Sequence, residues 1–529
     1  MAKARSAKIK FPLGGSYRRA GYAQKTQPFT APRAVNVRAF GPLERRGRGG
    51  SRPGLVKLVD NDFGTNILGI QSITYLDSDG DRQQDLAVIC DGVLNIVSGE
   101  TVTPTTANLV TDDGDMIVDE DGNQIIFTST VSSSSPLDKS SAFSMVERGG
   151  KLYIADSSLK KYDPVTGVVE VVAGAPTSQP LVCVYQERLV LAGEDHMFYM
   201  CAQADETDWN FTVDKDNVGR AVAGYVGDGG KLGEVINSMV NYQDKALILG
   251  TTDSLWAVYG NPAGGGKKVC VSAFSGVVAP SAITVTPDGL VLFVTRRGIY
   301  SWRVGSEQEP EPFSLERLPE ALLDTDPTAV DVQLIYDHKA RGVHLFLTPS
   351  TGDGTHWWLD LVNKAFWEVS FGTTTHQPVC TGRLATSGDS GIMLGCQDGY
   401  LRYFANSAED DDGEDLESNL LLGPFHVPRM EGADGMVAEM VAAFAAGSGD
   451  VTWKLVMANS AETVVDLAED MLAGTESSDA LASGTWLAGQ NKVVYPRSRG
   501  AWAVLWLSAT EPWAYEAVTM WMKKLGRLR

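Results

Sequence analysis

The sequence has few cysteines and no long apolar run, and each shortage excludes a class of protein. Its six cysteines are scattered over 529 residues without a Cys-x-x-Cys pair, so the sequence predicts neither a disulfide scaffold nor a cysteine zinc site. The best late apolar run, residues 501–507, is far shorter than the roughly 20 residues of a membrane helix. The basic N-terminus is not followed by an apolar stretch. We therefore expect reduced cysteines in a protein made inside a cell, no signal peptide and no membrane span.

Motifs for catalysis and nucleotide binding are also scarce. The six histidines show no H-x-H or H-E-x-x-H spacing, and no G-x-x-x-x-G-K-[ST] loop is present, which disfavours zinc catalysis and nucleotide hydrolysis. The stretch STGDGTHW, ending at Trp357, approaches the Asp-box of sialidases, but Thr355 stands where the second glycine belongs and the stretch is not repeated. We predict that the protein is not an enzyme. A glycosidase or sialidase whose pocket gathers four arginines remains a less favoured alternative, and these are Arg38, Arg296, Arg297 and Arg383.

The composition favours strands and tight turns, and the charge is unevenly distributed. The chain has 55 glycines and only 21% charged residues, with a steady supply of valine, tryptophan and tyrosine, as in all-β proteins. Residues 1–57 carry 14 lysines and arginines against one acid, Glu44, whereas the remainder carries 31 basic and 65 acidic residues. A body with this excess of acid is unsuited to coat DNA, while the basic segment is suited to reach an acidic surface.

One pattern recurs seven times along the chain: a polar or glycine turn, an apolar strand, a second turn, and another apolar strand. The leading turns lie near Gly80, Gly149, Glu187, Asp244, Asp288, Ala340 and Asp389, about 52 residues apart on average. A four-stranded blade cannot bury both of its faces alone, so a closed ring of blades is the natural arrangement. The sequence thus predicts an all-β fold built on a β-propeller of six or seven blades.

Changes in composition divide the chain into four parts. We predict a basic N-terminal arm (1–33), a propeller (34–406) with insertions at about 99–135 and 205–235, a solvated acidic linker (407–417) and a C-terminal β-sandwich-like domain (418–529). The linker is inferred from the run Glu409-Asp-Asp-Asp-Gly-Glu-Asp415, whose like charges repel one another. Residues 436–446 have helical spacing and leave a helix or a strand open there.

One acidic turn has the spacing of a calcium loop. Asp77, Asp79, Asp81 and Asp85 occupy positions 1, 3, 5 and 9 of a loop between two expected strands, and Ca²⁺ prefers several carboxylate oxygens presented in this way. The loop resembles the calcium loops of integrin-type propeller blades, although Arg82 stands where glycine is usual. The alternative is an acidic hairpin turn without a metal, and no other cofactor is expected.

Several segments in order along the chain resemble the tail nozzle and hub proteins of short-tailed bacteriophages, also described as packaged-DNA stabilisation proteins. The segments are RGGSRPGL (48–55), DETDWNF (205–211), GIYSW (298–302), WWLD (357–360) with Trp367, QDGYLRY (397–403), and the ending from YPRSRG (495–500) to GRLR (526–529). The resemblance covers most of residues 34–404 and extends to the C-terminal end. It implies a structural virion protein in the tail, assembled in the host cytoplasm, that forms a homo-oligomeric ring of six subunits.

The resemblance also implies partners. The ring would lie below the portal and the head-to-tail adaptor, contact tail fibre or tail plug proteins, and continue the channel through which genomic DNA passes without specific binding. The alternative is a glycan-binding or receptor-binding propeller, in which strand tryptophans such as Trp357 stack on sugars; the structural interpretation of these tryptophans is blade packing.

The charge asymmetry suggests how such a ring is held together. We expect a channel wall rich in carboxylates, which repels phosphate and lets DNA slide. Basic residues near both ends of the chain are predicted to bind acidic surfaces of neighbouring subunits or the adaptor. They are Arg45, Arg46, Arg48, Arg52, Lys523, Lys524, Arg527 and Arg529.

Overall fold

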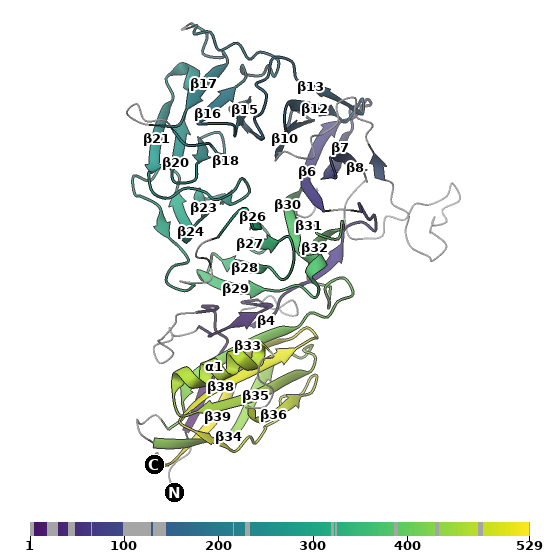
Figure 1. Cartoon of the computed structure of the whole chain (residues 1–529). Helices are drawn as coiled ribbons and strands as arrows, with labels where there is room; N and C mark the ends of the chain where they lie inside the picture. The colour runs from purple at the N-terminus through teal and green to yellow at the C-terminus, as the bar shows by residue number, and fades with distance from the viewer. Residues whose placement is uncertain are drawn as a thin grey trace, which may run out of the picture.

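The structure is a computed structural model, and it describes most of the chain. The described residues are 5–17, 30–40, 48–64, 66–98, 128–130, 144–214, 216–227, 233–318, 322, 325–385, 390–428, 433–473 and 480–527. They form a ring of β-sheets with a second β-domain beside it (Figure 1). None of these residues belongs to a helix whose length and apolar character would suit a membrane span.

The first four blades are four-stranded antiparallel sheets, each with its strands in chain order. Blade one holds β6 (Ile67–Leu76), β7 (Arg82–Cys90), β8 (Val93–Ser98) and β9 (Thr128–Thr130). Blade two holds β10 (Ser144–Arg148), β11 (Lys151–Ala155), β12 (Leu159–Asp163) and β13 (Val168–Val171). Blade three holds β14 (Leu181–Tyr185), β15 (Arg188–Ala192), β16 (Met197–Met200) and β17 (Val222–Tyr225). Blade four holds β18 (Ser238–Tyr242), β19 (Ala246–Gly250), β20 (Leu255–Tyr259) and β21 (Lys267–Ser272), with a 3₁₀ turn at Pro262–Gly264.

Three further blades complete the ring. Blade five holds β22 (Ile283–Val285), β23 (Leu290–Thr295), β24 (Gly298–Arg303) and β25 (Glu311–Pro312). Blade six holds β26 (Val330–Asp337), β27 (Gly342–Pro349), β28 (Thr355–Asp360) and β29 (Ala365–Val369), followed by a 3₁₀ turn at Thr374–His376. Blade seven holds β30 (Pro378–Ala385), β31 (Ser390–Cys396), β32 (Leu401–Ala405) and, from the N-terminal side of the chain, β5 (Gly54–Lys57).

Packing between neighbouring blades explains both the sequence pattern and the closure. All five residues of β15 and of β19 are buried, because each sheet is covered on both faces by its neighbours. Each first strand contacts the first strand of the next blade, and β30 returns to contact β6. The prediction of a propeller is confirmed, and the number of blades is seven. All seven predicted turns fall between the first and second strands of a blade.

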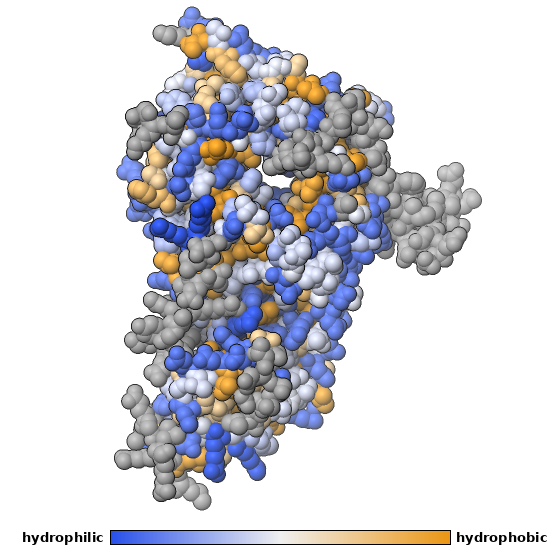
Figure 2. All heavy atoms as spheres, viewed as in Figure 1, coloured by the Kyte–Doolittle hydropathy of each residue, from blue (hydrophilic) through white to orange (hydrophobic). Residues whose placement is uncertain are grey.

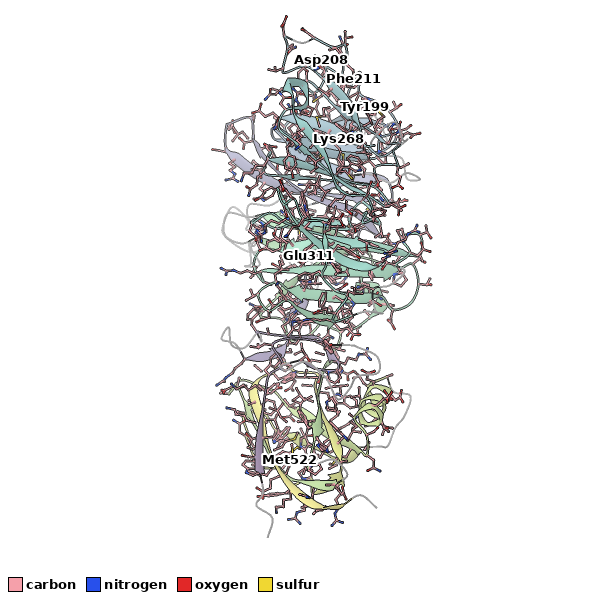
Figure 3. The ribbon with its side chains drawn as sticks, turned by 90° about the vertical axis from the view of Figure 1, so that its left-hand side faces the viewer. Tyr199, Asp208, Phe211, Lys268, Glu311 and Met522 are labelled. Carbon is pink, nitrogen blue, oxygen red and sulfur yellow. The ribbon has the colours of Figure 1, made fainter. Side chains whose placement is uncertain are left out.

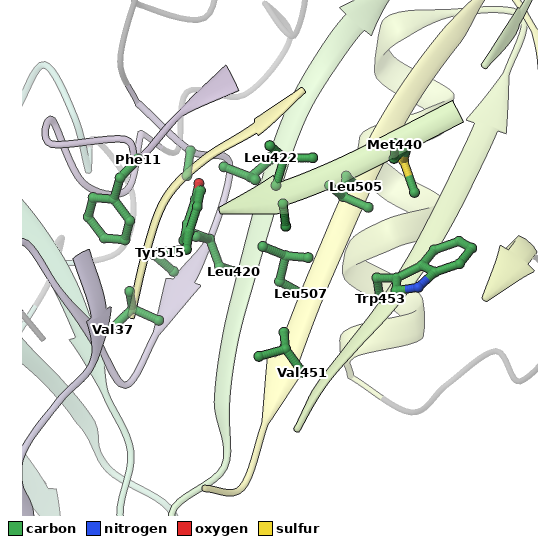
Figure 4. Packing of buried hydrophobic residues seen from close by; sticks show 14 of the residues in the cluster. Phe11, Val37, Leu420, Leu422, Met440, Val451, Trp453, Leu505, Leu507 and Tyr515 are labelled. Atoms are coloured by element: carbon green, nitrogen blue, oxygen red, sulfur yellow. The ribbon is translucent and has the colours of Figure 1, made fainter. Parts of the chain in front are cut away.

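The C-terminal domain consists of two sheets and one helix. One sheet contains β33 (Ser418–His426), β38 (Trp502–Ala509), β35 (Val451–Ala458) and β36 (Ala480–Trp486). The other contains β34 (Ala433–Phe444), β39 (Ala514–Arg527), β37 (Ser498–Gly500), β1 (Arg5–Lys10), β3 (Val37–Arg38) and β4 (Gly49–Ser51). Figure 4 shows their shared core, in which Leu420, Leu505 and Met440 interdigitate. Helix α1 (Ala461–Leu472) covers the opposite face of the first sheet and packs on Leu421, Val456 and Val504.

The two domains are joined by continuous sheet. Strand β2 (Ala34–Val35) pairs in parallel with β29 of blade six through Val35 and Glu368, and antiparallel with β33 through Ala34 and Leu420. Blade six and the first C-terminal sheet thereby become one nine-stranded sheet. Figure 3 shows the resulting elongated molecule, with Met522 near one end and Tyr199 and Phe211 of the third-blade region near the other.

Several predicted segments need correction. The predicted arm is not a separate element, because β1 pairs with β39 and the Phe11 ring stacks on Trp367. Strands β3 and β4, which the prediction placed in the propeller, belong to a C-terminal sheet. The two predicted insertions contain β9 and β17, the outer strands of blades one and three, which are short and carry little apolar alternation. The remaining parts of those insertions at 99–127, 131–135 and 228–232 lie outside the described residues.

The ambiguous stretch 436–446 is largely strand. It falls mainly in β34, where burial follows the two-residue period of a strand over much of its length. The helix of this domain lies later, at α1, and begins with Ser460, whose side chain accepts a hydrogen bond from the Thr463 N–H.

Candidate functional site

A buried ionic cluster occupies the junction between the two domains. Arg52, between β4 and β5, donates from Nη1 to Asp411 Oδ1 at 2.9 Å and from Nη2 to Asp411 Oδ2, and both side chains are fully buried. Its Nε donates to the side chain of Asn36 at 2.8 Å, and its remaining N–H groups meet the carbonyls of Pro53 and Ser370. Every donor of this guanidinium therefore has a partner, which a buried arginine needs.

The acidic run is the partner of the basic segment. Lys57 Nζ lies 3.7 Å from Asp412 Oδ2, and Arg402 of β32 donates to Asp412 and to both carboxylate oxygens of Asp398. The prediction of a wholly solvated linker at 407–417 is therefore wrong at Asp411, which is buried. Like charges gather here because cations from distant segments compensate them, a pairing that local sequence does not reveal.

The predicted partner-binding residues differ in burial. Arg52 is buried against its own chain, so its assignment to an external acidic surface is corrected. Arg48 is partly buried, as is Lys523 on β39, while Lys524 is exposed. Arg527 ends β39, and its side chain lies outside the description, as do Arg45, Arg46 and Arg529.

The predicted calcium loop does not bring its four carboxylates together. Asp77 Oδ1 accepts hydrogen bonds from the N–H groups of Asp79 and Asp81, and its Oδ2 accepts from Gln83. These hydrogen bonds lower the pKa of Asp77. Asp85 instead lies within β7 and accepts from the Tyr75 hydroxyl at 2.8 Å. Over the part of the chain that the structure describes, no three histidine, cysteine, aspartate or glutamate side chains form a group suited to a metal.

Of the four arginines considered for an enzyme pocket, only Arg38 lines the pocket described here. Arg296 and Arg297 lie in the β23–β24 turn of blade five, and Arg383 lies on β30 of blade seven. The pocket is a cavity of about 500 Å³ beside the domain junction. Its walls come from the N-terminal segment and blades six and seven, and they are Arg38, Phe40, Pro53, Asp337, Lys339, Ala340, Arg341, His344, Trp358, Val362, Phe404 and Asn406.

Burial dominates the electrostatics of this pocket. The Arg38 guanidinium lies over the Trp358 ring at 4.3 Å from its centroid and 5.5 Å from that of Phe404. Its burial and the neighbouring Arg52 lower the pKa of Arg38 to about 9. Burial likewise lowers the pKa of His344 to about 4, although His344 Nε2 lies 3.6 Å from Asp337 Oδ2. His344 and Arg38 are among the groups that hold the pKa of Asp337 down at about 2, against the effect of its burial.

Sequence reasoning considered Arg38 but not its surroundings. Asp337 and Trp358 lie some 300 residues after Arg38 in the chain, and they meet it only because β3 lies at the edge of blade six, where it contacts β29. The hairpin carrying His344 and His356 was a visible signal, since histidine is uncommon in buried strands. The tryptophans of the propeller strands are buried, as their structural interpretation predicts, and they are Trp256, Trp302, Trp357, Trp358 and Trp367.

The strands around the propeller axis are nearly balanced in charge. Their acids are Glu147, Asp331 and Asp337, and their bases are Arg148 and Arg383. Figure 2 shows the opening at the centre of the ring, with apolar side chains near its border. The acid-rich channel wall expected from composition is therefore not provided by the strands around this axis.

The comparisons with known proteins bear on the fold alone. No family model matches the chain, and no curated protein matches it. Among solved structures, the RRP9 WD40 repeats match with a TM-score of 0.43 and 8% identity, over 67% of this chain and 98% of that one. The structure of U3-55K matches with a TM-score of 0.40 and 8% identity, over 66% and 99%. The extracellular domain of a hybrid two-component system from B. thetaiotaomicron matches with a TM-score of 0.42 and 11% identity, over 75% and 43%.

Proposed function

We propose that this protein is a structural subunit of a short-tailed phage tail, forming the nozzle or hub ring that continues the DNA channel below the portal and adaptor. The observation that carries the proposal is where the segments of the family resemblance lie. Segment 48–55 contains β4, Arg52 and the start of β5, and segment 397–403 contains Arg402 and the start of β32. Trp367 stacks on Phe11. Segments far apart in the chain thus meet at the domain junction.

That placement suits a subunit that transmits force between its two domains. Because blade six continues through β2 into the C-terminal sheet, force applied to one domain passes through backbone hydrogen bonds to the other. Strand β5 is the outer strand of blade seven, and the acidic run covers part of its edge, because the Leu55 N–H donates to the Asp410 carbonyl and the Asp412 N–H donates to the Leu55 carbonyl. Covering an edge in this way limits unwanted edge pairing between copies. In this proposal DNA passes along the axis of the subunit ring, not through the nearly neutral centre of the propeller.

Lysines gather on β1 and β39, toward the end of the subunit farthest from blade three. Lys8 and Lys10 on β1 are exposed, and Lys8 forms a surface salt bridge with Glu516 of β39 at 3.3 Å. Strand β39 also carries Lys523 and Lys524, close to Met522 at this end. Exposed lysines of this kind contribute more to the rate and specificity of association than to affinity, and their effect falls with salt. We assign this end to contacts with an acidic surface of the adaptor or of a neighbouring subunit.

Sedimentation of the full chain, alone and with purified portal–adaptor complexes, tests the proposal at low and moderate salt. We expect a closed ring or a connector-bound species that weakens as salt rises. Lys523→Glu/Lys524→Glu should weaken this association several-fold, whereas the matched double reversal Lys245→Glu/Lys267→Glu on blade four should not. A protein that does not bind the portal–adaptor complex, but binds glycans or cleaves a chromogenic glycoside, would contradict the proposal and favour the receptor-binding or enzyme alternative.

A further inference from the structure

The pocket beside the domain junction contains an arginine fork without a partner. Arg38 is buried, and its Nε and Nη2 have no hydrogen-bond partner among the residues that the structure describes. These two nitrogens form one edge of the planar guanidinium, the edge that binds a carboxylate side-on. A buried donor without a partner is costly, and a buried cation more so.

The same chain shows what this edge does when an acid is present. Arg33, five residues earlier, donates from Nε to Glu368 Oε2 at 3.0 Å and from Nη2 to Glu368 Oε1 at 2.9 Å. Arg52 and Arg402 hold Asp411 and Asp398 through their other edge, with paired N–H groups of Nη1 and Nη2. Arg33, Arg52 and Arg402 thus each hold a carboxylate, whereas the described residues offer none to the Nε and Nη2 of Arg38.

The neighbouring acid does not fill the position. Asp337 Oδ1 accepts the N–H groups of Lys339 and Ala340 at 2.8 and 3.1 Å, and its Oδ2 faces His344. The rings of Trp358 and Phe404 attract the face of the Arg38 guanidinium, but they leave its in-plane N–H groups unsatisfied. Arg341, exposed at the pocket, adds a further positive charge.

We propose that this pocket binds a carboxylate group, held side-on by Nε and Nη2 of Arg38, with an apolar or ring-shaped body against Phe40 and Val362. A cavity of about 500 Å³ is within the range of small-molecule sites. The carboxylate comes from a small organic acid or from an acidic side chain of a second copy of this chain, and the two sources offer the same chemistry to Arg38.

Entry of the ligand requires a wall residue to move, because the fork is covered in this structure. Phe40 is suited to this movement, since the residue is 38% exposed and its ring meets Trp358 edge-on, with 6.3 Å between the ring centroids. The proposal does not depend on the phage-tail function and stands or falls separately from it.

Titration calorimetry of the full chain with benzoate, benzamide and inorganic phosphate tests the proposal. Benzoate should bind saturably and benzamide, its neutral counterpart, should not. Arg38→Met should weaken benzoate binding about 10- to 100-fold, as expected for loss of a charge-assisted hydrogen-bonded pair. Arg38→Lys keeps the charge but lacks the fork, so it should lose most of the binding too. Arg303→Met, at an exposed arginine of blade five, is the matched control and should bind as the wild type does.

Sedimentation of the same variants separates the two sources of the carboxylate. Self-association that benzoate competes with and Arg38→Met abolishes would identify an acid of a second copy, whereas benzoate binding to a monomer would identify a small organic acid. Thermal melts check that Arg38→Met and Arg38→Lys are folded, and Arg38→Lys, which keeps a cation near Asp337, separates loss of the fork from loss of the charge. The proposal is overturned if benzoate and benzamide bind alike, if phosphate binds and benzoate does not, or if neither benzoate binding nor Arg38-dependent self-association occurs.

Discussion

Blades two to five and blades six and seven are built differently. Each of blades two to five takes its four strands from one continuous stretch of chain, and each sheet ends at its own outer strand. Blade six is extended by β2 into the C-terminal sheet, and blade seven is completed by β5, which precedes β32 by more than 340 residues. The first group depends on local contacts and the second on pairing between distant segments, which costs more chain entropy to form.

The buried ion pairs follow the same division. In blade two, Lys160 Nζ pairs with Asp156, four residues earlier on the same hairpin. At blade seven, Arg52 pairs with Asp411 across 359 residues and also holds Asn36 and two backbone carbonyls. The first pair stabilises one blade, whereas the second connects ring closure to the domain junction.

Replacing Arg52 by alanine should cause the largest loss of stability. Arg52→Ala leaves the Asp411 carboxylate buried without its cation, a change that costs about 3 to 5 kcal/mol in other proteins. Because the pair connects β5 with the acidic run, we expect faster hydrogen exchange in β5, β32 and β2 together, with a lower thermal midpoint.

Lys160→Ala provides the control for that experiment. It also breaks a buried pair, but faster exchange should stay within blade two, since both partners belong to one hairpin. If Arg52→Ala loosened blade seven without affecting β2, the junction and the ring closure would be independent, and the proposed coupling would be wrong.

Two leucine truncations test the same difference between the two groups of blades, with a smaller expected loss of stability. Leu55 on β5 and Leu159 on β12 are each at most 2% exposed, and truncation of a buried leucine costs about 3 kcal/mol. Leu55→Ala should speed exchange in blade seven and in blade six, because Leu55 packs with Ile335 and Phe346 of blade six. Leu159→Ala should affect blade two and its direct neighbours. Hydrogen exchange followed by mass spectrometry measures both, and equal spread from the two sites would remove the distinction between the groups of blades.

The same division explains what the sequence could predict. The seven turns and the apolar strands around them are local signals, and Gly149, Asp244 and Asp288 lie at turns between first and second strands as expected. The repeat therefore indicated the propeller, but it left the number of blades at six or seven. It could not show that β5 completes blade seven, because a strand of only four residues carries too little sequence pattern to identify its partner strand.

The candidate site was harder to predict than the fold. The sequence offers Arg38 as one of four arginines that could share a pocket. The other three lie on blades five and seven, and composition does not show which blades are neighbours of Arg38. The calcium pattern was misleading because Asp85 belongs to a strand, where it accepts from Tyr75 instead of joining the loop. Repulsion among the carboxylates of the acidic run predicts a solvated linker. In the structure, Arg52 and Lys57, from the other end of the propeller sequence, neutralise Asp411 and Asp412 of this run.

Acid should destabilise blade six before blades two to five. Burial lowers the pKa of His344 and of His356 from 6.5 to about 4, and it lowers the pKa of His338 and His376 as well. Between pH 6.5 and pH 4 the unfolded chain binds protons at His344 and His356 that the folded chain does not. Stability therefore falls as the pH is lowered through this window.

The acid response can be assigned to His344 and His356 because the nearby Asp337 carboxylate titrates in a lower pH range. The pKa of Asp337 is lowered from 3.8 to about 2, so its contribution is kept above pH 3.8 and is lost only as the pH falls toward 2. We expect the thermal midpoint to decline between pH 7 and pH 4.5, with faster exchange in β27 and β28 than in β15 or β19. His344→Phe, which keeps a ring beside Phe346 and Phe404, should flatten part of this decline, and adding His356→Gln should flatten more. An unchanged slope in the double variant would show that the acid response arises outside blade six, because no proton uptake at these two rings would then remain to explain it.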